Sequence, residues 1–292
     1  MKFYKMHGLG NDFIFIVNQE FDKTRDITNF DKKGFIKKIS NRNFGIGCDQ
    51  FILFSKLDSF DNNEEIYEMQ IYNSDGSIAS ACGNASRCLG KLIFDNNVFG
   101  SNEFQNHGKS LELKNIKINV AGRVISCQKI SENIMKVNMG LAYFEKDWMP
   151  QNDYIINLAN KFNLPSENIS CVDVGNRHIV LIMDSLSEEE AFFLGSHINS
   201  EDYFGEGINV NFAVVKDKKI FLKTYERGVG MTMACGSGAC ASFAFAKKMG
   251  FVNNDCEVIF EAGKLKLSFD ENNSIMMEGP AIMIADGLYY DY

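Results

Sequence analysis

Two cysteines, one in each half of the chain, precede a glycine in nearly the same sequence context. Cys82 begins the run Cys-Gly-Asn-Ala-Ser, and Cys235 begins the run Cys-Gly-Ser-Gly-Ala. Each run leads into residues whose apolar spacing predicts a helix. A thiol at the start of a helix lies beside backbone N–H groups that have no partner in the helix, and the helix dipole favours its anion. The sequence therefore predicts two thiols whose pKa values lie below that of a free cysteine.

Two thiols of this kind could perform acid–base chemistry on one carbon atom. One thiolate would take a proton from the carbon while the opposite thiol delivers a proton to the other face, which inverts the stereocentre without a cofactor. The amides at the helix starts could bind a carboxylate and stabilise the charge that develops on it. Two other interpretations stay open at this point, namely close helix packing around inert thiols and a disulfide between the two cysteines.

The composition limits the possible classes of protein. With 292 residues, of which 45% are hydrophobic, the chain is long enough for two packed domains. A net charge of -8 argues against nucleic acid and anionic membranes as main partners. No apolar run approaches the roughly 20 residues that span a bilayer, and the first residues lack the apolar segment of a signal peptide. We therefore expect a cytoplasmic protein that acts on a small molecule.

The chain contains eight cysteines and four histidines. A long chain without a signal peptide is expected to keep its cysteines reduced, and no Cys-x-x-Cys pair indicates a zinc ribbon or a redox motif. The histidines have no metal-ligand spacing, so no metal site is predicted. Apart from Cys82 and Cys235, the cysteines are interpreted as small buried hydrophobic residues.

The two halves of the chain repeat each other beyond the cysteines. Tyr72 stands ten residues before Cys82, and Tyr225 stands ten residues before Cys235. A Gly-Asn pair also precedes an apolar strand in each half. We predict an α/β (α+β) fold of two similar domains from an internal duplication. Each domain is expected to be a mostly antiparallel sheet wrapped on a central helix, and the two domains are expected to face each other.

Local signals place several elements within these halves. Asp31 to Ile39 has a helical pattern, and a second helix is predicted to run to Ile198 from Ser187, which has the features of an N-cap before an acidic first turn. Gln50 to Leu57 and Ile66 to Tyr72 are predicted to be a pair of strands. The expected domains are residues 1–130 and 131–279.

The sequence resembles the diaminopimelate epimerase family in a series of motifs that together cover essentially the whole chain. The motifs lie at residues 5–13, 41–50, 72–77, 82–85, 207–212, 226–228 and 234–240, with the sequences KMHGLGNDF, NRNFGIGCDQ, YNSDGS, CGNA, GINVNF, ERG and ACGSGAC. The resemblance implies two similar α/β domains with the active site in the cleft between them. The last strand, about residues 280–292, would return to the first domain. The resemblance also implies an epimerase that interconverts LL- and meso-diaminopimelate with two cysteines and no cofactor, in lysine and peptidoglycan precursor biosynthesis.

The resemblance implies roles for individual residues as well. Cys82 and Cys235 would be the acid/base pair, with His178 and Glu226 adjusting thiol pKa values. Arg227 would bind the distal carboxylate of the substrate with its planar fork, and Glu226 would meet the α-ammonium group. The amides expected to hold the carboxylate on the reacting carbon are those of Gly83, Asn84, Gly236 and Ser237. The other expected polar contacts come from Asn11, Gln50, Asn73, Asn176 and Asn209.

Each of these residues also has a purely structural interpretation, and other functions compete. An Asn in a turn-like loop often serves only the backbone, Glu226 and Arg227 could be a solvated pair, and His178 could be a core histidine. A proline racemase-like enzyme would share the logic of two cysteines. A non-catalytic amino-acid binding protein would need neither cysteine.

The sequence departs from the family pattern at two places. Arg177 stands where the family usually has proline, so the φ angle before His178 is not fixed by a ring. Ala285 stands where the family tends to have an aromatic residue associated with its dimer contact. The second departure leaves open whether the chain forms a homodimer.

Overall fold

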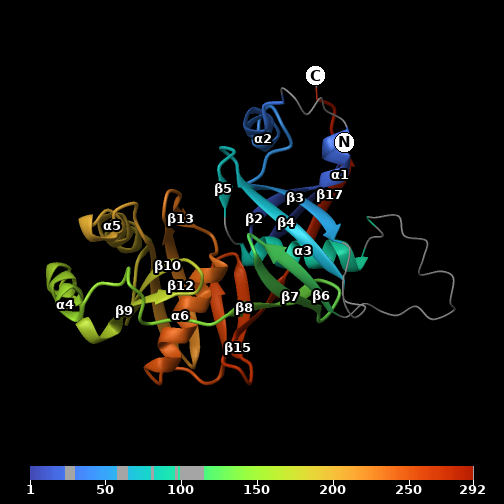
Figure 1. Ribbon diagram of the computed structural model, residues 1–292. Helices are drawn as coiled ribbons and strands as arrows, with labels where there is room; N and C mark the ends of the chain where they lie inside the picture. The colour runs from blue at the N-terminus through green and yellow to red at the C-terminus, as the bar shows by residue number, and fades with distance from the viewer. Residues whose placement is uncertain (24–29, 58–64, 80–81, 96–97, 99–114, 292) are drawn as a thin grey trace. The chain divides into compact units, whose positions relative to one another are not determined.

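The computed structural model describes residues 1–23, 30–57, 65–79, 82–95, 98 and 115–291, and it divides into two compact units. Unit 1 consists of Met1–Val137 with Gly279–Tyr292, and unit 2 consists of Asn138–Glu278. Each unit contains a mixed, mostly antiparallel sheet and one buried helix that packs on it (Figure 1). The predicted fold class is confirmed.

The sheet of unit 1 combines the start of the chain with its end. Its neighbouring strands are, in order, β17 (Ile282–Leu288), β1 (Lys2–Gly8), β2 (Asn11–Val17), β3 (Gln50–Leu57), β4 (Ile66–Asn73), β6 (Asn115–Val120), β7 (Arg123–Lys129) and β8 (Ile134–Gly140). The pairs β2–β3 and β4–β6 are parallel, and the other pairs in this order are antiparallel. A short strand, β5 (Ile78–Ala79), pairs with the end of β4.

A buried helix forms the centre of unit 1. α3 (Gly83–Asp95) packs against β1, β2, β7 and β17, and its first ten residues are all buried. β2 faces it with the continuous apolar run predicted from the sequence, as expected for a strand covered on both faces. Two further helices, α1 (Asn18–Lys23) and α2 (Lys32–Ser40), share a separate aromatic cluster with β3. Asp31 caps α2, and its carboxylate accepts a hydrogen bond from the Gly34 amide.

Unit 2 repeats this strand order. Its neighbouring strands are β9 (Ile169–Asp173), β10 (Arg177–Met183), β11 (Asn209–Lys216), β12 (Lys219–Glu226), β14 (Asp255–Phe260), β15 (Gly263–Phe269) and β16 (Ile275–Pro280). Again two pairs in this order, β10–β11 and β12–β14, are parallel, and they correspond to β2–β3 and β4–β6 of unit 1. A short strand, β13 (Gly230–Thr232), pairs with the end of β12 as β5 does with β4.

The helices of unit 2 also follow the pattern of unit 1. α6 (Gly236–Lys248) is the buried central helix and packs against β9, β10, β11, β12, β14 and β15. α4 (Asn152–Lys161) and α5 (Glu188–Asn199) belong to a second hydrophobic cluster, together with the 3-10 turn η3 (Asp202–Phe204). A further 3-10 turn, η2 (Ser166–Asn168), directly precedes β9. Ser187 and Glu190 form a reciprocal capping box at the start of α5, which confirms the predicted N-cap.

The strand registers identify corresponding positions in the two units. Pairs at the same place in the register are Phe13 and His178, Gln50 and Asn209, Ile52 and Asn211, Ile71 and Thr224, and Tyr72 and Tyr225. The two Cys-Gly runs stand at corresponding places as well, because each cysteine directly precedes the central helix of its unit.

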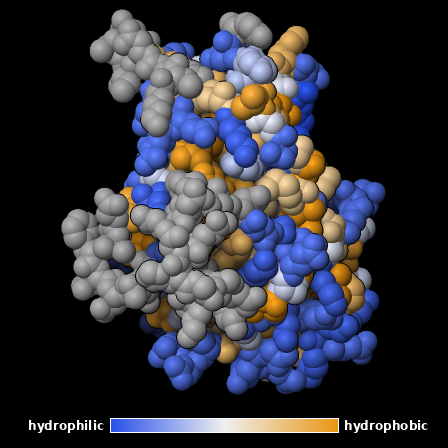
Figure 2. All heavy atoms as spheres, turned by 90° about the vertical axis from the view of Figure 1, so that its right-hand side faces the viewer, coloured by the Kyte–Doolittle hydropathy of each residue, from blue (hydrophilic) through white to orange (hydrophobic). Residues whose placement is uncertain are grey.

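The surface is mostly polar on the face shown in Figure 2, with hydrophobic side chains exposed among polar ones. The large exposed hydrophobic residues include Ile78, Val229 and Met233, which lie in the segments just before the two Cys-Gly runs. Within the described ranges, no helix is both long enough and apolar enough to cross a membrane.

Candidate active site: two half-sites

In unit 1, polar side chains gather at one edge of the sheet because of the strand directions. β2 begins at Asn11 and its parallel neighbour β3 begins at Gln50, while the antiparallel strand β4 ends at Asn73. Gln50 Nε2 donates a hydrogen bond to Asn73 Oδ1 at 3.1 Å. Gln50 Oε1 is buried and has no hydrogen-bond partner among the described residues. The edge therefore holds an acceptor that a bound molecule could satisfy.

Cys82 lies next to two of the residues expected to bind substrate. Its Sγ is 3.8 Å from Asn11 Oδ1 and accepts a hydrogen bond from the Ala85 amide at 3.5 Å. Asn84 Nδ2 donates to the same Asn11 oxygen at 3.4 Å. Cys82 is only partly buried. The structure thus brings Cys82, Asn11 and Asn84 together in the half-site of unit 1.

The orientation of Asn11 is set by a carboxylate that the sequence analysis did not select. Asn11 Nδ2 donates to Asp49 Oδ2 at 3.0 Å, and Arg42 holds the other oxygen of Asp49 at 2.7 Å. Because an ionised carboxylate only accepts hydrogen bonds, Asn11 must turn its nitrogen toward Asp49 and its oxygen toward Cys82. Asp49 and Arg42 therefore position Asn11.

Asp12 anchors this arrangement to the sheet. Its carboxylate receives both guanidinium nitrogens of Arg42 at 2.9 Å and the Lys5 ammonium at 2.6 Å. Burial alone would raise the pKa of Asp12, but the hydrogen bonds and charges of Arg42 and Lys5 outweigh it and hold the pKa well below its usual range. Asp12 is therefore ionised throughout the physiological pH range.

A fully buried arginine supports the start of α3. Arg87 has no exposed surface, and it donates to Asn84 Oδ1 at 2.8 Å and to the Pro280 carbonyl at 3.3 Å. The first bond fixes the side-chain amide of Asn84, whose nitrogen then faces Asn11. Arg87 therefore connects the C-terminal segment of unit 1, at Pro280, to the half-site of unit 1.

In unit 2, Cys235 is the N-cap residue of α6. Its Sγ accepts a hydrogen bond from the Gly238 amide at 3.4 Å and lies 3.5 Å from Ser237 Oγ. The residue is 5% exposed, so this thiol is more enclosed than that of Cys82. The geometry is the helix-start thiol that the sequence predicts.

The environment of Cys235 opposes the predicted lowering of its pKa. Burial is the main cause and the negative charge of Glu226 is the second, and together they raise the pKa of the thiol well above its ordinary value. The hydrogen bonds from Ser237 and from the Gly238 amide act in the opposite direction but are outweighed. The sequence prediction was wrong for this thiol because helix position alone says nothing about burial.

Asn176 and His178 lie beside Ser237 rather than in direct contact with the sulfur of Cys235. Asn176 Nδ2 donates to Ser237 Oγ at 3.2 Å, and His178 Nε2 lies 2.9 Å from Asn176 Oδ1. Complete burial lowers the pKa of His178 to about 3, so its ring is neutral near neutral pH. Any influence of His178 on the thiol must therefore pass through hydrogen bonds and not through a positive charge.

Asn209, Glu226 and Arg227 meet where β11 begins and β12 ends. Asn209 Oδ1 accepts from the Arg227 amide at 3.0 Å, and Asn209 Nδ2 donates to the Arg177 carbonyl at 3.0 Å. Glu226 accepts a hydrogen bond from Thr232 at 2.7 Å. The Arg227 side chain is 48% exposed and lies 3.9 Å from Glu206. This arrangement leaves the guanidinium accessible to an anion.

Arg177, in place of the usual proline, is held by other contacts. It opens β10 in register with Asp173, and its guanidinium lies over the Trp148 ring at 5.4 Å. The preceding loop is closed by the Gly175 amide, which donates to Asp173 Oδ1 at 2.9 Å. Side-chain contacts therefore hold the segment that carries Asn176.

The other cysteines are all buried, and none of them directly precedes a central helix. Burial raises the pKa values of Cys88, Cys127 and Cys171 to about 12, and those of Cys48 and Cys256 to about 11. Cys240 is fully buried in α6. Across the residues described by the structure, no group of three or more His, Cys, Asp or Glu side chains is arranged to hold a metal ion.

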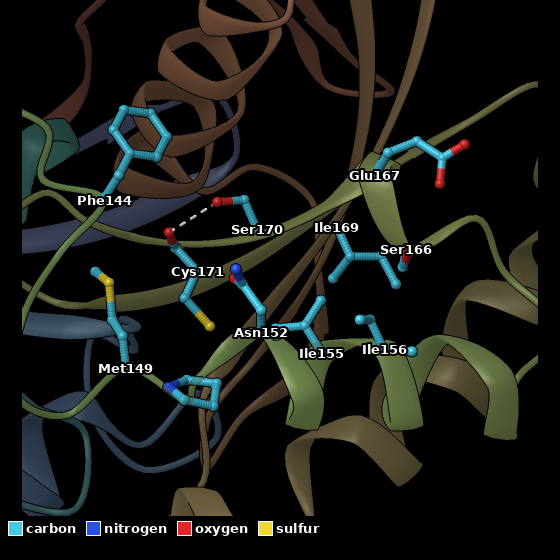
Figure 3. A pocket seen from close by; sticks show the side chains of 11 residues that line it. Phe144, Met149, Asn152, Ile155, Ile156, Ser166, Glu167, Ile169, Ser170 and Cys171 are labelled. Atoms are coloured by element: carbon cyan, nitrogen blue, oxygen red, sulfur yellow. Dashed lines mark hydrogen bonds between the residues drawn. The ribbon is translucent and has the colours of Figure 1, made fainter.

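A pocket of about 310 Å³ in unit 2 lies apart from the predicted site residues (Figure 3). Phe144, Met149 and Ile155 are among its lining residues, and Ser170 Oγ donates to the Cys171 carbonyl beside it. None of the residues expected to bind substrate or to transfer protons lines this pocket. We do not assign it to the half-sites.

The fold is shared with enzymes that invert stereocentres. It resembles the structure of a predicted epimerase from Pseudomonas aeruginosa, with a TM-score of 0.65 and 13% identity, covering 100% of this chain and 99% of that one. It also resembles a hydroxyproline epimerase from Agrobacterium vitis, with a TM-score of 0.57 and 11% identity, covering 98% of this chain and 90% of that one. These likenesses define the class as the duplicated two-unit fold of epimerases and racemases.

Sequence comparison gives the family. The sequence model of diaminopimelate epimerase matches residues 3–144 and 170–284. The diaminopimelate epimerase of Rickettsia bellii is 41% identical over 290 residues, which cover 99% of this chain and 98% of the relative. The chain belongs to the diaminopimelate epimerase family, as its motifs indicated.

Proposed function

We propose that this chain interconverts LL- and meso-diaminopimelate, with Cys82 and Cys235 as the acid/base pair. One observation carries the proposal: each cysteine directly precedes the central helix of its unit and accepts a hydrogen bond from an amide of the first turn. Family membership supports the choice of substrate. The reaction would belong to lysine and peptidoglycan precursor biosynthesis.

The reaction moves one proton from carbon and returns another. One thiolate removes the α-hydrogen as a proton, and the electron pair of the C–H bond stays on the carbon, conjugated with its carboxylate. The opposite thiol then gives its proton to the other face of the same carbon. The two sulfurs have then exchanged protonation states, and exchange with water or the reverse reaction restores them. This general acid–base sequence needs no cofactor.

The substrate-binding residues follow from the chemistry of the half-sites. The amides of Gly83, Asn84, Gly236 and Ser237 would hold the carboxylate on the reacting carbon, because helix N-termini favour anions. Arg227, with its accessible guanidinium, would bind the distal carboxylate. Gln50 Oε1, to which no described residue donates, would accept a hydrogen bond from an ammonium group. Further polar contacts would come from Asn11, Asn73, Asn176 and Asn209.

Glu226 would link binding to proton transfer. Its negative charge raises the pKa of the Cys235 thiol in the free protein, after burial as the larger cause. An α-ammonium group beside Glu226 would neutralise that charge and make the thiolate more accessible. His178 would act only indirectly, through Asn176 and Ser237.

Proton exchange in deuterated water tests the proposal. The protein is incubated with LL-diaminopimelate, and deuterium at the α-carbon is followed together with the isomer composition. We expect deuterium to enter as the meso isomer forms, with no change on addition of pyridoxal phosphate or EDTA. A folded, reduced protein that gives neither exchange nor inversion would refute the function. L-proline in a parallel reaction tests the racemase alternative, and binding of diaminopimelate without exchange would indicate a binding protein.

We also infer a cytoplasmic location and a homodimer. The location is supported by the chemistry, because the mechanism needs two reduced thiols. The dimer is supported by β17, which pairs with β1 and exposes Ile284 and Leu288. Ala285 is exposed on the same strand. Sedimentation of the protein would show whether an assembly forms, and loss of the dimer in an Ile284→Lys variant would assign it to this strand.

A further inference from the structure

Three polar side chains lie in the interior of unit 2 behind the start of α6. His178, Asn211 and Thr224 each have no exposed surface. They come from the neighbouring strands β10, β11 and β12, so the sheet itself aligns them. Asn211 and Thr224 are absent from the motif-based assignment of the site. Buried polar groups are costly unless their hydrogen bonds are satisfied, so their arrangement calls for a physical account.

The backbone fixes which way the Asn211 amide points. Its Nδ2 lies 3.1 Å from the Ile179 carbonyl oxygen, which can only accept a hydrogen bond. Its Oδ1 accepts from Thr224 Oγ1 at 3.2 Å. The other N–H of Asn211 faces His178 Nδ1 at 3.0 Å, which is closer than the Asn209 carbonyl oxygen at 3.4 Å. Because Asn211 Nδ2 can only donate, His178 Nδ1 must accept. His178 Nδ1 is therefore the unprotonated nitrogen of the ring, and the ring proton must lie on Nε2.

The same logic continues to the thiol. His178 Nε2–H donates to Asn176 Oδ1, which leaves the Asn176 nitrogen to donate to Ser237 Oγ. The Ser237 oxygen has then accepted one hydrogen bond, and its own O–H is free to donate to the Cys235 sulfur at 3.5 Å. Each hydrogen bond in this series, from Asn211 to Ser237, is donated in the direction of the Cys235 sulfur. A sulfur that receives such a bond is favoured as an anion.

We propose that Asn211 is a positioning residue, which fixes the direction of this hydrogen-bond relay so that the Ser237 hydroxyl donates to the Cys235 sulfur and favours its thiolate. The relay consists of Asn211, His178, Asn176 and Ser237. It opposes the two influences that favour the thiol form, namely burial and the charge of Glu226. Asp173 is the other charged group that acts on the relay, through its effect on His178.

The packing of α6 shows that Asn211 holds a fixed place. A Cβ atom at Gly238 would lie 2.2 Å from Asn211 Oδ1 and 3.2 Å from Thr224 Oγ1. The amide of Gly238 is also the group that donates to the Cys235 sulfur. The absence of a side chain at Gly238 lets Asn211 lie against the first turn of α6. The same small region therefore carries both hydrogen bonds to the sulfur.

The inference can be tested without substrate, although its catalytic meaning rests on the proposed function. Cys235 and Cys82 are alkylated with iodoacetamide in the same sample of the full chain, and mass spectrometry gives the rate at each thiol. In the parent protein the Asn211 amide fixes the direction of every hydrogen bond in the relay. In Asn211→Leu that constraint is lost, so the Ser237 hydroxyl no longer has to donate to the Cys235 sulfur. We expect the Cys235 rate near neutral pH to fall about threefold to tenfold, as for a weakened hydrogen bond to a charged group. The Cys82 rate in the same sample is the internal control.

A second variant guards against a folding defect. The triple substitution His178→Phe, Asn211→Ile and Thr224→Ile copies the apolar residues found at the corresponding places of unit 1. It should fold, because apolar groups of similar volume can replace buried polar networks, and it should slow Cys235 at least as much as Asn211→Leu does. Thr224→Val leaves the Ile179 contact in place and should slow Cys235 less.

The pH dependence of the alkylation rate distinguishes a change in the thiolate fraction of Cys235 from a change in the access of iodoacetamide to it. If the relay sets the thiolate fraction, the parent and variant rates at Cys235 converge at alkaline pH, where both sulfurs are ionised. A difference that persists at alkaline pH would mean altered access and would overturn the proposal. Folded variants with the parent rate at neutral pH would overturn it as well. A parent protein that does not epimerise, while Asn211→Leu still slows alkylation of Cys235, would contradict the proposed function and leave the relay in place.

Discussion

The two units share a strand order but bury different side chains behind the helix that follows each cysteine. In unit 2 the buried residues next to α6 include three polar side chains, His178, Asn211 and Thr224. The corresponding positions of unit 1 are all apolar and buried, and they are Phe13, Ile52 and Ile71. Polar support for Cys235 therefore comes from the sheet of its own unit.

Unit 1 supports its helix start in a different way. Arg87, five residues after Cys82, is fully buried and holds Asn84, whereas the residue five positions after Cys235 is Cys240. One unit thus uses a buried cation and the other a neutral relay. Duplication has kept the backbone position of the thiol while the buried side chains diverged. This difference would suit the proposed acid/base pair, because its two members must hold opposite protonation states at one pH.

The largest effect on activity is expected from replacing either thiol. Cys82→Ser and Cys235→Ser should each lower epimerisation by about 10²- to 10⁴-fold, the usual contribution of a general acid or base. Because the thiols act on opposite faces, each variant should retain exchange of the α-hydrogen from one isomer better than from the other. Deuterium incorporation is measured separately from LL- and meso-diaminopimelate.

Cys256→Ser is the control for general effects of replacing a buried cysteine with serine. Cys256 lies in β14 and is absent from both half-sites, so Cys256→Ser should turn over at close to the parent rate. Near-parent turnover in either Cys82→Ser or Cys235→Ser would mean that the two-thiol mechanism is wrong. Equal loss of exchange from both isomers would mean that the half-sites are not specialised.

A smaller effect is expected from Arg227, where the units differ in charge. The register places Glu226 and Arg227 of unit 2 at the positions of Asn73 and Ser74 in unit 1. Arg227→Gln should lower kcat/KM for diaminopimelate by about tenfold to a hundredfold, as for the loss of a charge-assisted bidentate contact. Most of the loss should appear as a higher KM in steady-state assays.

The conservative substitution sharpens this test. Arg227→Lys keeps the charge but loses the planar fork, so it should recover only part of the lost affinity. Full recovery would indicate a simple charge effect. An unchanged KM in Arg227→Gln would show that the distal carboxylate is bound elsewhere.

Much of the fold could be predicted because its signals are local or repeated. The apolar run of β2, the cap at Ser187 and the small residues after each cysteine are all visible along the chain. Because the two halves repeat each other, each half gave independent evidence for the same order of strands, Cys-Gly run and helix. α4 was missed, because Gln151 at its N-cap makes no side-chain cap hydrogen bond and only Leu158 and Ala159 of its residues are buried.

The candidate site was less predictable, since its support depends on neighbours distant in sequence. Asn211 is an ordinary asparagine in a strand until the sheet brings it beside His178 and Thr224. A polar residue on the buried face of an apolar strand was the available signal. The raised pKa of Cys235 could not be predicted either, because its main cause is burial, which depends on the whole fold.

The packing difference at the helix starts gives a stability prediction. Gly238 of α6 and Ala85 of α3 each stand three residues after the cysteine, and a Cβ atom at Gly238 would meet the buried Asn211. Asn211 is held by four hydrogen-bond partners and cannot easily move away from a new methyl group. Gly238→Ala should therefore lower the free energy of unfolding by about 1–3 kcal/mol in urea titrations.

A double variant identifies the cause of that loss. Adding Asn211→Ser, with its shorter side chain, should make Gly238→Ala less costly than it is in the parent background. An additive pair of effects would contradict the proposed clash. Ala85→Gly in unit 1 should cost about 1 kcal/mol, as expected for helix propensity alone.

The smallest effect concerns the pH dependence of stability, where His178 and its counterpart Phe13 differ. Burial lowers the pKa of His178 from 6.5 to about 3, so the native ring stays neutral while the unfolded chain takes up a proton below pH 6.5. The stability that this histidine contributes is present above pH 6.5 and is lost as the pH falls toward 3. Between pH 6.5 and about 5.5 the loss should be about 1 kcal/mol. His178→Phe should remove this part of the slope in urea titrations over the same interval, whereas the contributions of the carboxylates remain. An unchanged slope in the variant would show that the histidine takes up a proton in the native state, and the neutral relay of unit 2 would then be wrong.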